Sequence, residues 1–216
     1  MLVSPGMGVA GRVFAALITL VAVASLVLQY LLILGVTREN IGPALGTLRY
    51  FSYFTILSNI AVVLVAIHAA LARPGFFSSL TVRGGVTLYI AVTGGIYFFI
   101  LRHLWSPQGA QWWADTGLHY AVPLLYLMWW LSCVPHGGLS WRQVGMWLTF
   151  PALYVCWAFL RGAWVHEYPY PFIDVAQLGW SKVLMNSAGM LLLFVVVGLV
   201  LVGVDRLLGR RPKASL

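Results

Sequence analysis

The side chains that could carry out chemistry in this chain are the few polar ones that interrupt long apolar stretches. Ser52, Thr55 and Asn59 follow one another at spacings of three and four residues, so in a helix they share one face. Thr55 is the fifth residue after Tyr50, where its apolar stretch begins, which is roughly 7 to 8 Å along a helix. His119 lies at a matching depth in a separate stretch. A hydroxyl and an imidazole at one depth can exchange a proton, and an amide beside them can donate hydrogen bonds.

Further ionisable and amide side chains gather at the same ends of their apolar stretches. They are Arg102, His103, Arg161, His166, Asp174, Lys182 and Asn186. The opposite ends hold little comparable besides His68. Because ionisable groups in a membrane bundle face its interior or a water-filled cavity, we expect a polar pocket that opens toward one leaflet.

Each of these side chains also has a structural interpretation. A membrane Thr commonly bonds back to a carbonyl of the preceding turn, and a His near a helix end commonly pairs helices. Asn59 could join two helices, while Arg102 and Arg161 could extend to lipid headgroups. Asp174 could cap a helix or form an ion pair. The depth shared by the hydroxyl, amide and imidazole favours the pocket, since the structural interpretations predict no such coincidence.

The elements that must position these groups are transmembrane helices. Apolar residues make up 61% of the chain and charged residues only 8%, against the roughly 25% charged residues of a soluble domain. This composition excludes a water-soluble fold, a disordered chain and a nucleic-acid-binding module. In hydrocarbon only helices and closed barrels satisfy their own backbone, and the uninterrupted apolar runs lack the alternation of barrel strands.

We therefore expect an all-α fold, a six-transmembrane-helix bundle that forms one domain over residues 1–216 with a short basic cytoplasmic tail at 205–216. Each apolar run has the length of a membrane span. The runs cover Arg12 to Val36, Tyr50 to Leu71, Gly84 to Trp105, Thr116 to Val134, Gln143 to Trp164 and Lys182 to Val204. The two cysteines, Cys133 and Cys156, fall near opposite ends of separate spans, so we expect no disulfide, and no ligand spacing predicts a metal.

The distribution of Lys and Arg predicts the orientation. Eight of them lie on the side of the two termini and five on the other side. The positive-inside rule then places both termini in the cytoplasm and the pocket in the outer leaflet. Eleven Arg against two Lys indicate a bacterial genome, hence the bacterial cytoplasmic membrane. The basic tail could bind anionic headgroups or serve only as a topology anchor.

Three segments in register carry a resemblance to a known family. They are Tyr53–Asn59, Leu118–Pro123, and Val155–Trp157 followed by Trp164 and Tyr170–Asp174. Together they resemble the androgen-induced-gene and FAR-17a-like family of six-span membrane proteins, in its bacterial branch, and their order and spacing match from the second span to the sixth. Animal members of that family hydrolyse fatty acid esters of hydroxy fatty acids with a membrane Thr and a His.

The resemblance implies roles for two residues of this chain. The family's Thr corresponds to Thr55 and its His to His119, which precedes Pro123. In the implied mechanism His119 deprotonates Thr55, the hydroxyl attacks an ester carbonyl, and water then cleaves the acyl-threonine. The lead-in before Thr55 is longer and more aromatic than in the animal proteins, so Ser52 and Ser58 remain alternative nucleophiles.

Other polar side chains are candidates for supporting roles. Asn59, Asn186 and Arg102 could donate hydrogen bonds to the oxyanion. Asp174 could orient the catalytic imidazole or pair with Arg161. Where the animal proteins carry His residues after the Cys156–Trp157 motif, this chain has Phe159, Leu160 and Arg161, so its pocket differs there.

The predicted function is an intramembrane threonine hydrolase of lipid esters without a cofactor or a metal. Its partners would be membrane lipids or a long-chain acyl ester, and no nucleic acid. The alternatives are a non-enzymatic small-ion or proton transporter and a structural subunit of a membrane complex. A conduction path would need polar residues through the full membrane thickness, whereas the titratable groups here gather in one leaflet.

Overall fold

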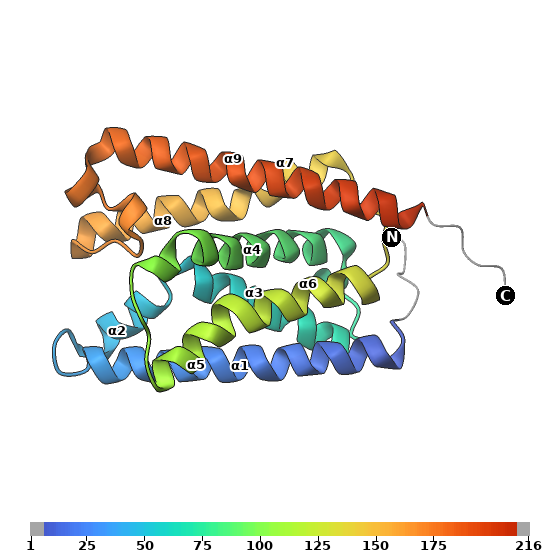
Figure 1. Ribbon diagram of the computed structural model, residues 1–216, viewed down its shortest axis with the longest axis horizontal. Coiled ribbons are helices and arrows are strands. Elements are labelled where there is room, and N and C mark those ends of the chain that lie inside the picture. Colours follow the sequence, from blue (N-terminus) through green and yellow to red (C-terminus); the bar gives the residue numbers. More distant parts are fainter. Residues whose placement is uncertain (1–6, 211–216) are drawn as a thin grey trace.

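The long apolar runs form the long helices of a bundle in the computed structural model, which describes residues 7–210 (Figure 1). Within these residues the chain forms helices and turns and no strand. The helical elements are α1 (Val9–Thr37), α2 (Gly42–Tyr50), α3 (Phe54–Ala70), η1 (Phe76–Ser78), α4 (Leu80–Phe99), η2 (Leu101–His103), α5 (Ala110–Thr116), η3 (Gly117–Ala121), α6 (Val122–Cys133), α7 (Trp141–Trp147), α8 (Thr149–Val165), η4 (Pro171–Ile173) and α9 (Val175–Gly209).

Several helices are long and apolar enough to cross a membrane. Four segments meet this description: Val9–Thr37, Leu80–His103, Trp141–Val165 and Val175–Gly209. α2 and α3 make a fifth span if they are counted together, although they are bent by 70° at their junction. The fourth expected span, Thr116 to Val134, lies in a segment that is helical from Ala110 to Cys133 but divided into α5, η3 and α6, of 7, 5 and 12 residues. The structure therefore agrees with an all-α membrane protein that has four or five candidate spans.

The break between α2 and α3 was not expected from the apolar run that begins at Tyr50. Ser52 is completely buried there, and its hydroxyl bonds back to the carbonyl of Leu48. The Ser52 carbonyl in turn accepts a hydrogen bond of 3.0 Å from the hydroxyl of Tyr154. These side chains satisfy backbone groups that the bend leaves without helical partners. The bend places Thr55 in the first turn of α3.

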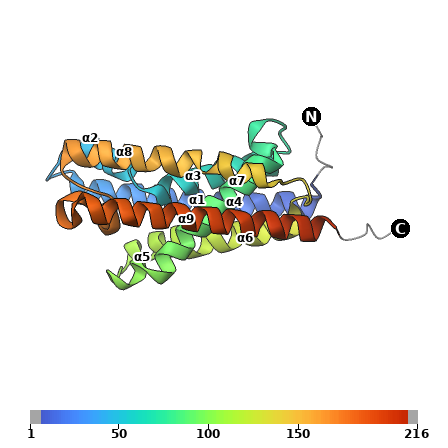
Figure 2. The same cartoon turned by 90° about the horizontal axis from the view of Figure 1, so that it is seen from above.

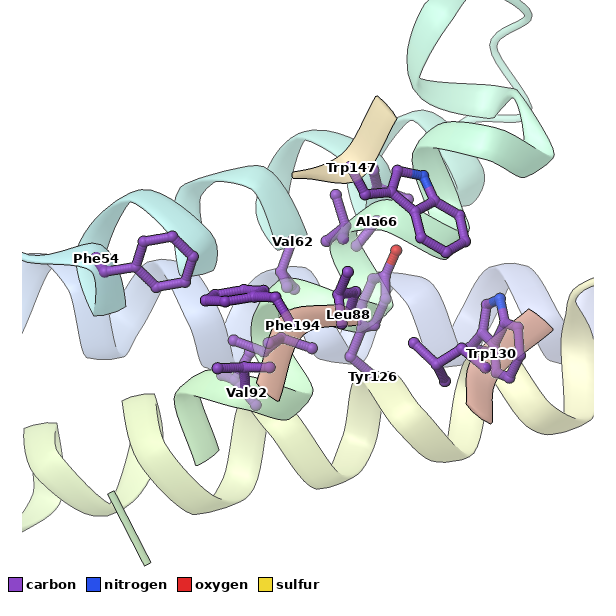
Figure 3. Close-up of a cluster of buried hydrophobic side chains, with 14 of the residues drawn as sticks. Phe54, Val62, Ala66, Leu88, Val92, Tyr126, Trp130, Trp147 and Phe194 are labelled. Atoms are coloured by element: carbon purple, nitrogen blue, oxygen red, sulfur yellow. The ribbon is translucent and has the colours of Figure 1, made fainter. Parts of the chain in front are cut away.

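The core lies between α3, α4, α6 and α9, where large side chains interlock (Figure 3). Leu88, Tyr126 and Trp129 are completely buried in it. α4 can approach α7 closely because Gly85 lies against the indole of Trp147, where a Cβ would come within 2.7 Å of the ring. Dense packing of this kind holds the helices in fixed relative positions.

The first and last long helices place the beginning and the end of the described chain at the same end of the bundle (Figures 1 and 2). The N-terminal end of α1 and the C-terminal end of α9 lie at the same end, and α2 lies at the opposite one (Figures 1 and 2). Of the expected basic tail, Arg206 stacks on Trp141 at 4.7 Å, whereas Arg211 and Lys213 lie outside the described residues. Cys133 and Cys156 are both free thiols.

Candidate active site

Thr55 and His119 lie side by side. The hydroxyl oxygen Oγ1 of Thr55 is 3.2 Å from Nε2 of His119, although 64 residues separate them in the sequence. Thr55 comes from the first turn of α3 and is 7% exposed, and His119 comes from η3. A hydroxyl within hydrogen-bond distance of an imidazole is the arrangement that can activate a weak nucleophile.

A local widening of the helix presents His119. η3 is a π-helix, a geometry that is rare and often found at functional sites. Pro123 lies four residues after His119 and has no N–H to give to the His119 carbonyl, so the ordinary α-helical bond cannot form there. Gly117 packs against Ser25 of α1, and a Cβ at Gly117 would clash with that side chain. Proline and glycine thus let η3 bulge while it remains close to α1.

The other ring nitrogen of His119 fixes its tautomer. Nδ1 lies 3.1 Å from the carbonyl oxygen of Asp115 and 3.2 Å from the Oδ1 of the same residue. Because both of these atoms are acceptors, Nδ1 carries the hydrogen and Nε2 presents its lone pair to the Thr55 hydroxyl. Thr55, His119 and Asp115 therefore have the relative placement in which a hydroxyl, an imidazole and a carboxylate can act as nucleophile, base and orienting group.

Tyr97 supports this pair from α4. Its hydroxyl donates to Oδ2 of Asp115, so both carboxylate oxygens of this 3% exposed residue have partners. Its ring stacks on the imidazole of His119 with centroids 3.9 Å apart and planes 15° apart. The imidazole is thus held both at its edge and on its face, which limits its rotation.

Tyr170 reaches Thr55 from the loop between α8 and α9. Its hydroxyl accepts a hydrogen bond from the backbone N–H of Thr55 at 3.2 Å and lies 3.3 Å from Oγ1. Burial raises the pKa of Tyr170 to about 12, so the hydroxyl keeps its proton at neutral pH. The N–H of Thr55 donates to a lone pair of the Tyr170 oxygen and does not use the phenolic hydrogen. That hydrogen can therefore be donated to an oxygen atom that lies next to Oγ1 of Thr55.

Asn59 and Ser58 form hydrogen bonds with the backbone next to Thr55 and His119. The amide of Asn59 donates to the carbonyls of Thr55 at 2.8 Å and Leu118 at 3.2 Å, so it ties α3 to η3. Ser58 donates to the Thr55 carbonyl and contacts the hydroxyl of Thr93. Neither Ser58 nor the buried Ser52 contacts His119 among the hydrogen bonds of residues 7–210. The geometry favours Thr55 over both serines as the partner of the imidazole.

The remaining predicted residues contact other groups. Asn186 donates to the Phe172 carbonyl at 2.8 Å, and the Arg102 guanidinium lies 3.9 Å above the ring of Phe98. Asp174 caps α9 through the N–H of Gln177, as the structural interpretation predicts. Within residues 7–210 none of these three side chains forms a hydrogen bond with Thr55 or His119, because each contacts the other partner named here.

A charge cluster anchors the loop that carries Tyr170. Glu167 accepts from Arg49 of α2 at 2.8 Å and from Arg161 of α8 at 3.2 Å. Arg161 also donates to the Glu167 carbonyl at 2.7 Å. Arg161 therefore pairs with Glu167 and not with Asp174, because Glu167 lies in the same turn as the end of α8. The loop is fixed to two helices through one carboxylate.

Two cavities meet at Thr55. The first, here called the apolar cavity, has a volume of about 270 Å³ and lies between α4, α8 and α9, with walls that include Ile96, Val155, Ala188, Met190 and Phe194. The second, here called the polar cavity because the charged side chains lie in its wall, has a volume of about 430 Å³; most of its wall is apolar, and its polar residues include Gln29, Arg49, Gln111, Asp115 and His119. Thr55, Leu101 and Tyr170 line both cavities.

Sequence reasoning missed Asp115, Tyr97, Tyr170 and Glu167. A signal existed for Asp115, which precedes His119 by four residues and so shares its helix face. The loop that carries Tyr170 is rich in aromatic residues and proline, but its sequence did not predict the contact of Tyr170 with Thr55. Nothing along the sequence distinguishes Tyr97 from other membrane tyrosines.

No family model, no curated protein and no solved structure matches this chain. Within residues 7–210, no group of three or more His, Cys, Asp or Glu side chains is placed to hold a metal ion. Function must therefore be inferred from the geometry of the site.

Proposed function

We propose that the protein is an intramembrane hydrolase of lipid carboxylic esters in which Thr55 is the nucleophile and His119 the general base. One observation carries this proposal: the Thr55 hydroxyl lies 3.2 Å from Nε2 of an imidazole whose Nδ1 is fixed by Asp115. The resemblance to the androgen-induced-gene and FAR-17a-like family supports the same chemistry and the substrate type, fatty acid esters of hydroxy fatty acids.

The first half-reaction makes an acyl-threonine. Nε2 of His119 takes the proton from Thr55, and Oγ1 forms a bond to the ester carbonyl carbon. The bond between that carbon and the alcohol oxygen then breaks, and the alcohol oxygen receives the proton from Nε2. The acyl group remains on Thr55 as an ester, and the alcohol is free to leave.

The second half-reaction restores the hydroxyl. His119 takes a proton from a water molecule, whose oxygen bonds to the acyl carbon. The bond from Oγ1 to that carbon breaks, and Thr55 recovers the proton held by His119. The carboxylic acid is released, so one water molecule is consumed for each ester cleaved.

The surroundings of the pair stabilise the charges that form in both steps. The carboxylate of Asp115 faces the imidazolium at 3.2 Å. The hydroxyl of Tyr170 can donate to the oxyanion, a contribution that typically changes rates by about 10²- to 10³-fold. Thr55 also lies in the first turn of α3, where the positive end of the helix dipole favours a negatively charged oxygen.

The same proposal includes six membrane spans. The bent pair of α2 and α3 would form one span, and α5, η3 and α6 together another, because each group contains one of the apolar runs of the sequence: α3 covers most of Tyr50 to Leu71, and η3 with α6 covers most of Thr116 to Val134. Both termini would lie in the cytoplasm of a bacterial cell and the site in the outer leaflet, as the Lys and Arg count supports.

Purified protein in detergent with a long-chain acyl ester provides the test. Thr55→Ala and His119→Ala should each remove turnover, and a fluorophosphonate probe should label Thr55 in the wild type only. Thr87→Ala is a matched control, because Thr87 is a buried threonine of α4 whose hydroxyl bonds only to the Arg83 carbonyl. Full turnover by Thr55→Ala, or a wild type that cleaves no ester, would contradict the proposal.

A further inference from the structure

We propose that the site holds its ester in one fixed orientation, with the acyl chain in the apolar cavity and the alcohol part in the polar cavity. This inference rests on the proposed function. Thr55 lies in the walls of both cavities, whereas His119, which delivers the proton to the leaving alcohol, lines only the polar cavity. The orientation follows from this difference.

The first step concerns the leaving alcohol. His119 lines the polar cavity and not the apolar one, and the same is true of Asp115. Because Nε2 must deliver its proton to the alcohol oxygen, that oxygen has to lie on the side of His119. The rest of the alcohol, which continues from this oxygen, therefore extends into the polar cavity.

The second step concerns the acyl chain. Its carbonyl carbon bonds to Oγ1 of Thr55, and its chain must continue away from the departing alcohol. The apolar cavity begins at Thr55 and is walled by side chains such as Ile96, Val155 and Phe194. Apolar walls suit a hydrocarbon chain, because burying each methylene away from water is favourable.

The third step concerns water. Release of the alcohol vacates the polar cavity, and the hydrolytic water must then meet His119 at the same place. Gln29 and Gln111, which bond to each other at 2.8 Å, line this cavity together with Arg49 and can hold water. The apolar cavity stays filled by the acyl chain during this step. One orientation thus serves both half-reactions, whereas the reverse would place the acyl chain where water is needed.

Two substitutions that narrow the cavities test this orientation. Ala188→Phe adds a ring to the wall of the apolar cavity, and Gln111→Trp adds one to the wall of the polar cavity. Leu192→Phe is the matched control on α9, because Leu192 is 63% exposed and lines neither cavity.

Each variant is assayed with two pairs of esters. 4-Methylumbelliferyl palmitate and acetate differ only in the acyl chain, and dodecyl and methyl palmitate differ only in the alcohol. Ala188→Phe should lower the palmitate-to-acetate ratio of kcat/KM about tenfold, and Gln111→Trp should lower the dodecyl-to-methyl ratio by a similar factor. Leu192→Phe should keep both ratios of the wild type.

The outcomes separate this inference from the proposed function. If Ala188→Phe lowers the dodecyl-to-methyl ratio and Gln111→Trp the palmitate-to-acetate ratio, the orientation is reversed and the inference is wrong, while ester hydrolysis stands. Equal loss of both ratios in both variants also overturns it. A wild type that cleaves none of the four esters contradicts the proposed function itself.

Discussion

Two histidine–aspartate pairs lie near opposite ends of this bundle, and within residues 7–210 only the pair of His119 faces a side-chain hydroxyl. Nδ1 of His119 is 3.2 Å from Asp115, and Nδ1 of His136 is 3.2 Å from Asp205. Both aspartates are almost completely buried. The pairs differ at the second ring nitrogen, which faces the hydroxyl of Thr55 in the first pair and the backbone carbonyl of Leu131 in the second.

That difference separates the chemical role proposed for His119 from a structural role for His136. Both ring nitrogens of His136 face acceptors, so neither can accept a proton from a nucleophile. Asp205 also accepts from the N–H of Leu139 at 2.9 Å and thereby ties the turn after α6 to α9. The backbones of Gly137 and Gly209 touch beside it, where a Cβ would clash. A buried His–Asp pair alone therefore does not identify a catalytic site.

The largest expected effect comes from removing each imidazole. His119→Ala should lower kcat/KM by about 10³-fold or more, because it removes the base. His136→Ala should keep kcat/KM and lower Tm, because it leaves the Asp205 carboxylate buried with one partner fewer. Ester turnover and thermal unfolding in detergent measure the two effects. A similar loss of turnover in both variants would remove the distinction between the pairs.

The next effect concerns the carboxylates. Asp115→Asn should lower kcat by about 10²- to 10⁴-fold, because an amide can stabilise neither the imidazolium nor the required tautomer. Asp205→Asn is the matched change in the second pair and should act on Tm alone. Full activity of Asp115→Asn would show that its backbone carbonyl suffices to orient His119.

A smaller effect is expected at Tyr170. Tyr170→Phe removes the hydroxyl beside Thr55 and should lower kcat by about 10- to 10²-fold while KM changes little, because an oxyanion donor acts mainly on the transition state. Tyr89→Phe is the control, since the Tyr89 hydroxyl bonds to the Trp147 carbonyl away from Thr55. An increase in KM at constant kcat would assign Tyr170 to substrate binding instead.

The smallest effect is a dependence of stability on alkaline pH. Burial raises the pKa of Tyr170 from 10.0 to about 12, so between these values the folded chain binds more protons than the unfolded one. The contribution of this residue is present below pH 10 and decreases as the pH rises toward 12. Tm measured from pH 9 to 11.5 should fall less steeply in Tyr170→Phe than in the wild type. Parallel curves would contradict the assignment.

The sequence predicted the depth of the polar groups better than their direction. The spacing of Thr55 and Asn59 places both on one helix face, and the structure keeps them together. Arg102, Asn186 and Asp174 share that end of the bundle yet contact other partners, because depth along a helix does not determine which neighbour a side chain faces. The direction depends on how α4 and α9 pack, which is a tertiary property.

Two local features were also beyond the sequence pattern. The bend before α3 occurs at Phe51–Tyr53 without a proline or a glycine, and the buried Ser52 at its centre is supported by Tyr154, which is distant in the sequence. The π-helix at Gly117–Ala121 depends on Pro123 together with the tight contact against Ser25. Apolar runs predict that these segments are helical but not how each helix deviates from regularity.

The order of the site residues along the chain determines when the site is completed during synthesis. Thr55 emerges first, His119 follows 64 residues later, and Tyr170 follows 115 residues after Thr55. The wall of the apolar cavity contributed by α9 is made later still. A nascent chain already inserted in the bilayer therefore has the hydroxyl and the base without the tyrosine or a complete cavity. The proposed hydrolytic site would therefore remain incomplete until α9 is in place.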